Sequence, residues 1–381
     1  MGPLEGIKVV ELAGLGPAPM CAMLLAEMGA TVIRIERKAP VQNEGNPRPR
    51  KFDLLLRGRP AIAMDLKQPA AIACVLDMAA QADALIEGFR PGVMERLGLG
   101  PGICLARNPR LVYGRMTAWG QDGPLSQAAA RDINAIALSG ALHAIGRRGQ
   151  PPSIPLSLVG DFGGGALYLM QGVLAAIISA QRTGRGQVVD AAMLDGAASL
   201  MTNFYGRHAS GAWGSERGSN ITDSGAWFYD VYECADHKWL AVGALEASSQ
   251  QQLLAVLELD AASVGSAVDR GNWPRARTIL AARFRTRARD AWCARFEACD
   301  ACVAPVLDFD EAPQHAHPGA RGTFVEVEGI PQPGPAPRFS ATPTRIPMPP
   351  QEITAANTAR ALSKWFDPEG IARLRSNGVI D

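Results

Sequence analysis

The chain has 381 residues, 47% of them hydrophobic and 20% charged, which is typical of a globular protein long enough for two domains. Its 38 basic and 37 acidic residues nearly cancel, so the chain has no general field to attract nucleic acid or an anionic membrane. Any anion-binding site must therefore be a local cluster of basic side chains.

No segment predicts a transmembrane helix, because the longest apolar stretch, residues 166–180, is interrupted by Tyr168 and Gln171. A strand pattern begins almost at the N-terminus, which argues against a signal peptide. We therefore expect a cytoplasmic protein without a membrane partner. Cys299 and Cys302 form a lone Cys-x-x-Cys pair that lacks the further ligands of a structural zinc site, so no metal is predicted.

The first third of the chain alternates between strand-like and helix-like segments. Helical patterns occupy residues 20–28 and 69–80. The strand-like runs are residues 7–12, 30–36, 61–65, 84–87 and 111–116. This alternation predicts an α/β fold with a Rossmann-like parallel sheet and helices on both of its faces.

The rest of the sequence predicts a second, smaller domain. A large Rossmann-like domain is expected over residues 1–204. Residues 205–225 are rich in Gly, Ser and Asn and are predicted to be a linker, and residues 226–316 to form a small α+β domain. The proline-rich residues 317–350 then return the chain, and a C-terminal helix within residues 351–381 is expected to pack on the large domain.

The loop after the first predicted strand has part of a dinucleotide-binding fingerprint. Gly14 and Gly16 follow the strand, and Glu36 ends the next strand, where a ribose-binding acid would lie. Pro19, however, occupies the place of the third glycine, which the fingerprint needs for close helix–strand packing. The pattern therefore indicates a Rossmann-like unit without a nicotinamide cofactor, and no other cofactor is predicted.

Two acidic residues stand at predicted helix starts. Asp161 precedes a run of three glycines, residues 163–165, that opens a long apolar helix over residues 166–182. It can be a simple N-cap, but a carboxylate at a helix N-terminus is also stabilised as an anion and can accept a proton or act as a nucleophile. Glu246 follows an apolar strand pattern, where a first-turn helix glutamate is the commoner case.

Basic side chains follow several of the predicted strands. Open parallel sheets bind ligands at the carboxyl ends of their strands, so Arg37, Arg90 and Arg96 are candidates to converge on phosphate groups. Each of them alone also fits a solvated surface charge.

Longer motifs are spread over nearly the whole chain, at residues 2–14, 85–93, 132–134, 158–165, 188–193 and 301–307. They include Leu-Ile-Glu-Gly-Phe-Arg-Pro-Gly-Val at residues 85–93 and Leu-Val-Gly-Asp-Phe-Gly-Gly-Gly at residues 158–165. Together they resemble the α-methylacyl-coenzyme A racemase branch of the CaiB/BaiF-like family III coenzyme A (CoA) transferases.

The resemblance implies two domains joined by crossing linkers, and two chains interlocked in a homodimer. It also implies an acyl-CoA substrate, held mostly by the large domain, and an active site completed by the small domain of the partner subunit. In this branch a histidine and an aspartate face each other across the α-carbon of the acyl group. One removes the α-proton, an enolate forms, and the other returns a proton to the opposite face.

By matching motifs, the aspartate is Asp161, the histidine position is Arg131, and Glu246 matches a glutamate associated with the same site. The remaining positions that the resemblance assigns to ligand binding are Arg37, Met64, Asp65, Leu66, Lys67, Gly88, Phe89, Arg90, Arg96, Ala130, Asp132, Ile133, Asn134 and Ala135.

The chain departs from the family in one loop, where the usual Gly-His-Asp-Ile-Asn-Tyr reads Ala-Arg-Asp-Ile-Asn-Ala at residues 130–135. A histidine with a pKa near neutrality suits proton abstraction, whereas a guanidinium stays protonated. Arg131 can instead stabilise an enolate or bind a carboxylate. His143 is not placed to replace the base, because on a continuous helix it would lie about 120° around and about 18 Å along from position 131.

Three functions stay open at this point. The first is an acyl-CoA enzyme resembling the racemase, with Asp161 as the surviving acid/base. The second is a CoA transferase in which Asp161 attacks the thioester to form a mixed anhydride and Arg131 orients an acceptor carboxylate. The third is a non-catalytic acyl-CoA-binding protein. Gly16 stands where transferases carry a glutamine and no glycine loop follows Glu246, which favours the first.

Overall fold

The structure, a computed structural model, describes residues 2–38 and 49–381. It divides into two compact units. Unit 1 comprises Met1–Ser139, Leu156–Leu200 and Ala316–Asp381, and unit 2 comprises Gly140–Pro155 and Met201–His315. Unit 1 is therefore assembled from three stretches of chain, and most of unit 2 is inserted between the second and the third.

Unit 1 contains a six-stranded sheet in the order β3-β2-β1-β4-β5-β6, and every neighbouring pair is parallel. The strands are β1 (Lys8–Leu12), β2 (Thr31–Arg37), β3 (Ala61–Met64), β4 (Ala84–Glu87), β5 (Val112–Thr117) and β6 (Val188–Ala192). The predicted α/β fold with a parallel sheet is thus confirmed. Strand β6 escaped prediction because it is an edge strand whose first three residues are at least partly exposed.

Alternate residues of the strands supply two separate hydrophobic cores, one on each face of the sheet. Val10 and Ile33 belong to one core, and Val9 and Val32 to the other. This is the side-chain alternation of a strand covered on both faces. The helices of unit 1 are α1 (Pro17–Glu27), α2 (Pro69–Ala79), α3 (Val93–Arg96), α4 (Pro101–Arg107), α5 (Asp132–Leu138), α7 (Leu167–Thr183), α8 (Met193–Leu200), α14 (Ala316–Arg321), α15 (Ala355–Leu362) and α16 (Pro368–Ser376), with 3-10 turns η1 (Arg50–Phe52) and η2 (Leu54–Leu56).

Helix α7 continues without a break from the π-helix η3 (Leu158–Ala166), so the helix predicted to begin at residue 166 begins eight residues earlier. The combined helix, Leu158–Thr183, has 26 residues and is long and apolar enough to cross a membrane by length and composition. This corrects the expectation that the apolar stretch is too short. One side of α7, with Leu169, Val173 and Ile177, packs into a core of unit 1, as in core helices of globular proteins.

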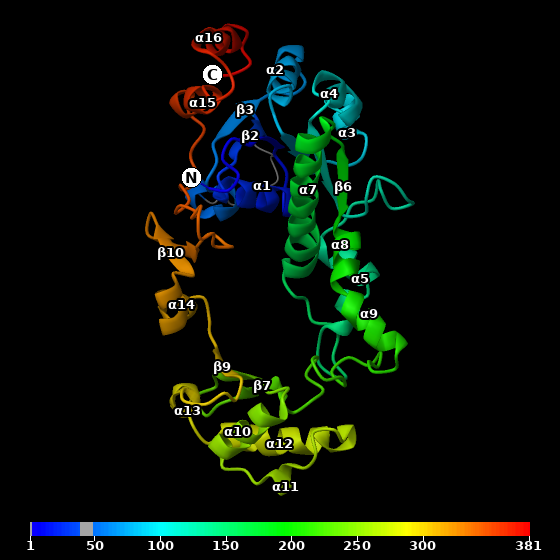
Figure 1. The fold of residues 1–381 in the computed structure, drawn as a ribbon, viewed down its shortest axis with the longest axis vertical. Coiled ribbons are helices and arrows are strands. Elements are labelled where there is room, and N and C mark those ends of the chain that lie inside the picture. The colour runs from blue at the N-terminus through cyan, green and yellow to red at the C-terminus, as the bar shows by residue number, and fades with distance from the viewer. Residues whose placement is uncertain (1, 39–48) are drawn as a thin grey trace. The chain divides into compact units, whose positions relative to one another are not determined.

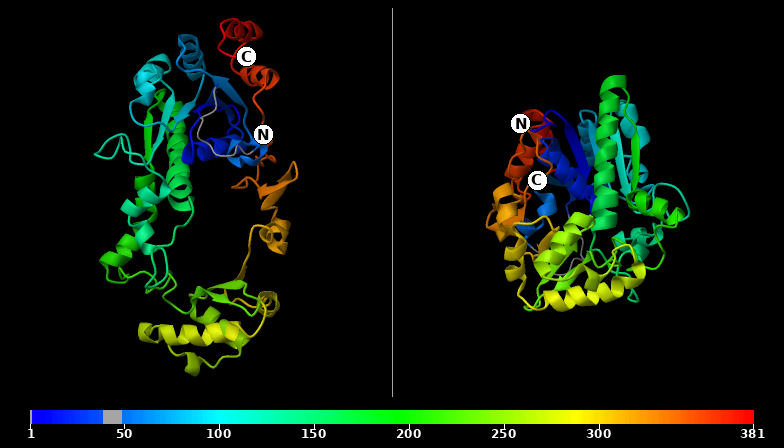
Figure 2. Two further views of the ribbon diagram at one scale, coloured as in Figure 1. Left: turned by 180° about the vertical axis from the view of Figure 1, so that it is seen from behind. Right: turned by 60° about the horizontal axis from the view of Figure 1, so that its bottom comes forward.

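The C-terminal segment of the chain packs on unit 1. Leu362, Trp365 and Ile380 belong to the same core as Val10. Lys8 Nζ donates a hydrogen bond to the carbonyl of Lys364 at 2.9 Å and lies 5.0 Å from the Trp365 ring centroid. Helices α15 and α16 stand beside the blue N-terminal strands in Figure 1 and in both views of Figure 2. The strands β10 (Phe324–Val327) and β11 (Ile330–Pro333) form an antiparallel hairpin within the preceding stretch.

Unit 2 has a three-stranded antiparallel sheet in the order β7-β8-β9, formed by β7 (Tyr229–Glu233), β8 (Trp239–Gly243) and β9 (Val303–Val306). Its core is aromatic and contains Trp227, Tyr232, Phe284 and Trp292. The helical elements are α6 (Ala141–Ala144), α9 (Thr202–Ala209), α10 (Ala247–Leu257), α11 (Ala261–Val264), α12 (Trp273–Phe284), α13 (Arg289–Phe296), η4 (Arg270–Asn272) and η5 (Ala312–Gln314).

The bounds of unit 2 differ from those of the small domain expected at residues 226–316. Arg147 forms an ion pair with Asp230 at 2.5 Å, and Arg148 one with Glu216 at 2.9 Å, so the segment Gly140–Pro155 lies with unit 2. The stretch predicted as a linker, residues 205–225, contains most of α9 and the buried Asn220, whose side chain bonds the loop around it.

Candidate functional site

An open cavity of about 360 Å³ lies in unit 1, at the carboxyl ends of the central strands. The order of the strands along the sheet reverses between β1 and β4, and open α/β sheets bind ligands at such a switch point. The loop after β1 contributes residues 14–17 to the cavity lining, and the loop after β4 contributes residues 88–91. These two loops are called the β1 wall and the β4 wall below.

Asp161 reaches the cavity from the first turn of η3, where Ser157 holds the N-cap position. Three glycines let this π-helix pack backbone against backbone. A Cβ at Gly164 would lie 2.5 Å from the amide nitrogen of Ala197 in α8, and a Cβ at Gly165 would lie 2.8 Å from the Cβ of Pro17 in α1. The glycine run is therefore a packing requirement that sets where the Asp161 carboxyl stands, and π-helical turns are frequent at functional sites.

The pKa of Asp161 is raised above its ordinary value of 3.8. Burial is the largest cause, and the negative charge of Asp132 adds to it. A hydrogen bond with the Ser157 side chain and the positive charge of Arg131 act in the opposite direction without cancelling the rise. A half-buried carboxyl with a raised pKa that lines a cavity is a candidate acid/base group.

Asp132 orients the helix turn that carries Asp161. Its side chain is buried, and its Oδ2 accepts hydrogen bonds from the backbone N–H groups of Gly160 and Asp161, both at 2.6 Å. A Cβ at Gly160 would come within 2.7 Å of the same oxygen, so only glycine allows this approach. Oδ1 of Asp132 has no hydrogen-bond partner within the described part of the chain. The geometry makes Asp132 a support of the site and not part of the cavity lining.

Arg131 lines the cavity from the N-terminus of α5 and is exposed. An arginine side chain has no acceptor with which to cap a helix. Instead Oδ1 of Asn134 accepts the backbone N–H of Arg131 at 3.0 Å, and the guanidinium donates to the neighbouring carbonyl of Ala130 at 3.1 Å. Helix α5 ends at Leu138, so His143 is not on the same helix as Arg131 and belongs to unit 2.

The β1 wall faces the Asp161 carboxyl directly. Gly16 has a φ of 67°, and a Cβ there would lie 3.0 Å from Oδ2 of Asp161. A side chain at position 16 would therefore be strained and would collide with the carboxyl. Glycine at this position keeps the space beside Asp161 open to a ligand.

The β4 wall is supported by an ion network around the buried side chains of Glu87 and Arg115. Glu87, at the end of β4, accepts the backbone N–H of Phe89 at 2.7 Å and a hydrogen bond from Nε of Arg115 at 2.9 Å. Arg115 also pairs with Glu95 at 2.8 Å. Burial raises the pKa of Glu87, and the contacts with Phe89 and Arg115 oppose that rise. Burial is the largest influence on the pKa of Glu95 and acts to raise it, but the hydrogen bonds to its carboxylate and the positive charge of Arg115 together outweigh burial, so the Glu95 pKa is lowered.

The structure brings together six of the residues expected at the site. Gly88, Phe89, Arg90, Ala130, Arg131 and Asp161 all line the cavity. Arg37, Arg96 and Lys67 are exposed and are not part of its lining, while Asp65 accepts the N–H of Lys67 at 3.0 Å. The side chains of Met64 and Ala135 are fully buried in the two cores, and Leu66 packs against one of them.

The other expected residues lie outside the cavity lining. Ile133 and Asn134 belong to the first turn of α5, and Glu246 is the N-cap residue of α10 in unit 2. Of the basic residues expected to converge on phosphates, only Arg90 faces this cavity.

A third side of the cavity was not predicted from the sequence; it is formed by Thr117 at the end of β5 and by Ala118 and Trp119 after it. The indole Nε1 of Trp119 is buried and has no hydrogen-bond partner among residues 2–38 and 49–381. The available signal was positional, because this segment follows the predicted strand at residues 111–116 and therefore lies at the same carboxyl edge of the sheet.

The sequence profile of the CoA-transferase family III matches residues 4–352 of this chain. The chain is 40% identical over 380 residues to mouse alpha-methylacyl-CoA racemase, covering 99% of this chain and 97% of that protein. It is 26% identical over 410 residues to mouse succinyl-CoA:glutarate CoA-transferase, covering 100% of this chain and 91% of that protein. The crystal structure of a CAIB/BAIF family protein from Brucella suis shares the fold, with a TM-score of 0.82 and 23% identity over 96% of this chain and 100% of that one.

Proposed function

The chain belongs to the CoA-transferase family III, and from that premise we propose that it is a racemase-like acyl-CoA enzyme that acts on the α-proton of a 2-methylacyl-CoA thioester. The observation that carries the proposal is the half-buried Asp161 carboxyl with its raised pKa, in a cavity at the switch point of the sheet. The similarity to the mouse racemase over nearly the whole chain supports the same class of reaction.

In the proposed reaction the Asp161 carboxylate removes the α-proton and becomes a carboxylic acid, while the two electrons of the C–H bond enter an enolate of the thioester. Arg131 does not take up a proton, because its guanidinium is already protonated. It is instead placed to stabilise the negative enolate oxygen, a role that typically contributes about 10²- to 10³-fold to a rate. The Asp161 carboxylic acid then returns the proton to carbon.

A single working base has a stereochemical consequence. Asp161 approaches the α-carbon from one face only, so it exchanges the α-proton with retention of configuration. Inversion needs a proton donor on the opposite face, the position that the resemblance assigns to Arg131. We therefore expect exchange of one enantiomer to be much faster than racemisation.

The proposal includes the other features that the resemblance implies. Arg90, on the β4 wall, is the first candidate to contact the CoA moiety, since it lines the same cavity as Asp161. An interlocked homodimer would bring Glu246 of unit 2 to the site of a partner subunit. Light scattering of the purified protein gives its mass in solution, and a monomer would remove this part of the proposal.

A CoA transfer reaction is the second candidate, and Arg131 is the observation that favours it. In this reaction Asp161 attacks the thioester carbonyl, the C–S bond breaks, and CoA leaves as a thiolate to give a mixed anhydride on Asp161. An exposed guanidinium in the same cavity can bind the carboxylate of an acceptor acid. The similarity to a succinyl-CoA:glutarate CoA-transferase supports this second candidate.

The deciding experiment follows deuterium incorporation at the α-carbon of each enantiomer of a 2-methylacyl-CoA in deuterated buffer. We expect exchange of one enantiomer with retention. Asp161→Ala should slow it by about 10³-fold, a typical contribution of a general base, and Arg131→His should increase inversion relative to exchange. Asp195→Asn, which changes an exposed carboxyl of α8, is the matched control and should leave the rate unchanged.

Full-rate exchange in the Asp161→Ala variant would exclude Asp161 as the base. Absence of exchange in the unmodified protein, together with trapping of an anhydride at Asp161 by hydroxylamine, would establish CoA transfer instead. If the α-proton reaction is correct, the pKa of Asp161 fixes its acid limb. Because that pKa is raised, the rate should fall on acidification at a higher pH than it would with an ordinary aspartate, whose pKa is 3.8.

A further inference from the structure

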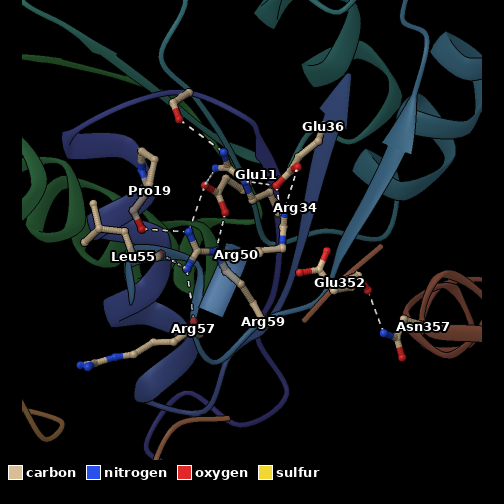
Figure 3. A network of polar contacts seen from close by, with 11 residues as sticks. Glu11, Pro19, Arg34, Glu36, Arg50, Leu55, Arg57, Arg59, Glu352 and Asn357 are labelled. Atoms are coloured by element: carbon tan, nitrogen blue, oxygen red, sulfur yellow. Dashed lines mark hydrogen bonds and ion pairs between the residues drawn. The ribbon is translucent and has the colours of Figure 1, made fainter. Parts of the chain in front are cut away.

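The carboxylate of Glu11, near the end of β1, forms ion pairs with two arginines in the interior of unit 1 (Figure 3). Glu11 is fully buried, and Arg34 and Arg59 are nearly so. Nε of Arg59 donates to Oε2 of Glu11 at 2.6 Å, and Nη1 of Arg34 donates to Oε1. These three residues are called the Glu11 cluster.

Both arginines also hold the loop that follows β1. Nη2 of Arg59 donates to the carbonyl of Pro19 at 3.0 Å, and Nη2 of Arg34 donates to the carbonyl of Gly14 at 3.4 Å. The two carbonyls stand at the two ends of residues 14–19, called the glycine turn here. Remaining donors of Arg59 reach the carbonyls of Leu55 and Arg57, at 2.6 Å and 3.3 Å, so its guanidinium is fully engaged.

The glycine turn is the part of the chain that lies against Asp161. Its residues 14–17 form the β1 wall, Gly16 meets the Asp161 carboxyl, and Pro17 packs on Gly165 of the π-helix η3. A displacement of the turn would therefore change the space beside the reacting carboxyl. Misplacement of a catalytic group by about 1 Å can lower a rate by about 10²-fold.

We propose that Arg34 and Arg59, held by Glu11, are positioning residues that fix the glycine turn against Asp161. The catalytic part of this inference rests on the proposed function, whereas the fixing of the turn does not. Burying three charged groups is a costly way to stabilise a core, since well-packed apolar side chains of similar volume are often at least as stabilising. An arginine offers what such a core lacks, namely several N–H groups in a rigid fork that can reach a carboxylate and a backbone carbonyl together.

A second buried ion pair provides a matched control. Nε of Arg57 donates to Glu27 at 2.7 Å, and both residues are buried in unit 1. The Arg57 side chain bonds Gln332 and the carbonyl of Pro333, and makes none of the contacts with the glycine turn. The effect of losing a buried charge can thus be separated from the effect of losing the hydrogen bonds that hold the glycine turn.

The test compares Arg59→Lys with Glu27→Gln in the full chain. A lysine keeps the positive charge beside Glu11, but it cannot reach the Pro19 carbonyl and Glu11 with a fork. Amide hydrogen exchange at Ala13 and Met20, which flank the turn, reports on it, because the Ala13 N–H donates to the carbonyl of Ile35 at 2.9 Å and the Met20 N–H donates to the carbonyl of Gly16 at 3.4 Å. We expect exchange there to rise about 10-fold in Arg59→Lys, with no local rise in Glu27→Gln.

The second readout is the α-proton exchange of the thioester. Arg59→Lys should lower kcat about 10-fold and leave KM within about twofold, since the turn faces the carboxyl and not the bulk of the ligand. Arg34→Lys is the substitute if Arg59→Lys does not fold, and we expect the same rise in amide exchange at Ala13 and the same fall in kcat.

Unchanged protection of the turn in the folded variant, or an equal rise in Glu27→Gln, would overturn the inference. A rise in amide exchange without any catalytic change would also overturn the positioning role. If the unmodified protein shows no α-proton exchange, the proposed function fails, and the amide measurement alone still decides whether the cluster fixes the turn.

Discussion

The two walls of the cavity are both supported by buried carboxylates at strand ends, but the two supports differ in how they meet solvent. Beneath the β1 wall, Glu11 is enclosed by two arginines, and the Arg59 side chain has no exposed surface. Beneath the β4 wall, Glu87 shares Arg115 with Glu95, whose side chain is 45% exposed. Arg34 also pairs with Glu36, whose side chain is 20% exposed, so the support of the β1 wall is less open to solvent than that of the β4 wall.

The difference assigns separate properties to the two sides. The Glu11 carboxylate is fully buried, so removing it leaves buried positive charge behind. The Arg115 network contains two carboxyls whose pKa values are shifted in opposite directions, one raised by burial and one lowered by its arginine. The β4 wall is therefore expected to respond to pH.

The largest effect should come from removing the fully buried carboxylate of Glu11. Glu11→Ala leaves the buried Arg59 guanidinium without its anion, although Arg34 keeps Glu36 as a partner, and we expect a loss of about 4 kcal/mol in the free energy of unfolding. Glu87→Ala should cost less, because Arg115 keeps Glu95 as a partner. Urea denaturation of both variants checks the order. Equal losses, or a larger loss in Glu87→Ala, would contradict the distinction between the walls.

A smaller effect should appear in the pH dependence of stability. The pKa of Glu87 is raised above 4.5 by folding, so the folded protein holds its proton longer than the unfolded chain does. The free energy of unfolding should consequently fall as pH rises from 4.5 through the folded pKa of Glu87. Glu87→Gln should flatten that fall. Urea denaturation over a series of pH values makes the comparison, and an unchanged slope in Glu87→Gln would refute it.

The smallest effect is expected at the exposed end of the Arg115 network. The folded pKa of Glu95 is lowered, so its contribution is present above 4.5 and is lost as pH falls through the folded pKa. Because the side chain is partly exposed, Glu95→Gln should cost less than about 1 kcal/mol, and added salt should reduce the difference further. A cost as large as that of Glu87→Ala would show that the network is not open to solvent in the way described.

Prediction from the sequence succeeded where the signal was local. The apolar runs of β1 to β5 are short, bounded and separated by helical patterns, and they lie where the structure has strands. It failed for the start of the helix that carries Asp161, because Leu158–Ala166 is a π-helix held by glycine contacts with α8 and α1. Such contacts depend on residues far away in the chain and leave no periodic pattern in the helix itself.

For the site, six of the predicted residues line one cavity, but the sequence did not reveal the contacts that support it. Ligand binding by Asp132 stays a prediction, and in the structure its side chain accepts hydrogen bonds from the backbone of Gly160 and Asp161. The buried pairing of Glu11 with Arg59 spans 48 positions along the chain, so no spacing rule reveals it. The proposals for Arg131 and Glu246 remain predictions that rest on the resemblance to the family.

The assembly of unit 1 from separated stretches affects how the protein is made. A ribosome completes the first two stretches and then all of Met201–His315 before it begins Ala316–Asp381. Trp365 and Ile380, which belong to the core around Val10, are thus synthesised after all of unit 2. Unit 2 can fold as soon as it emerges, whereas unit 1 must wait with part of its apolar surface uncovered. The nascent chain is therefore expected to need protection of unit 1 from aggregation until residues 316–381 have been synthesised.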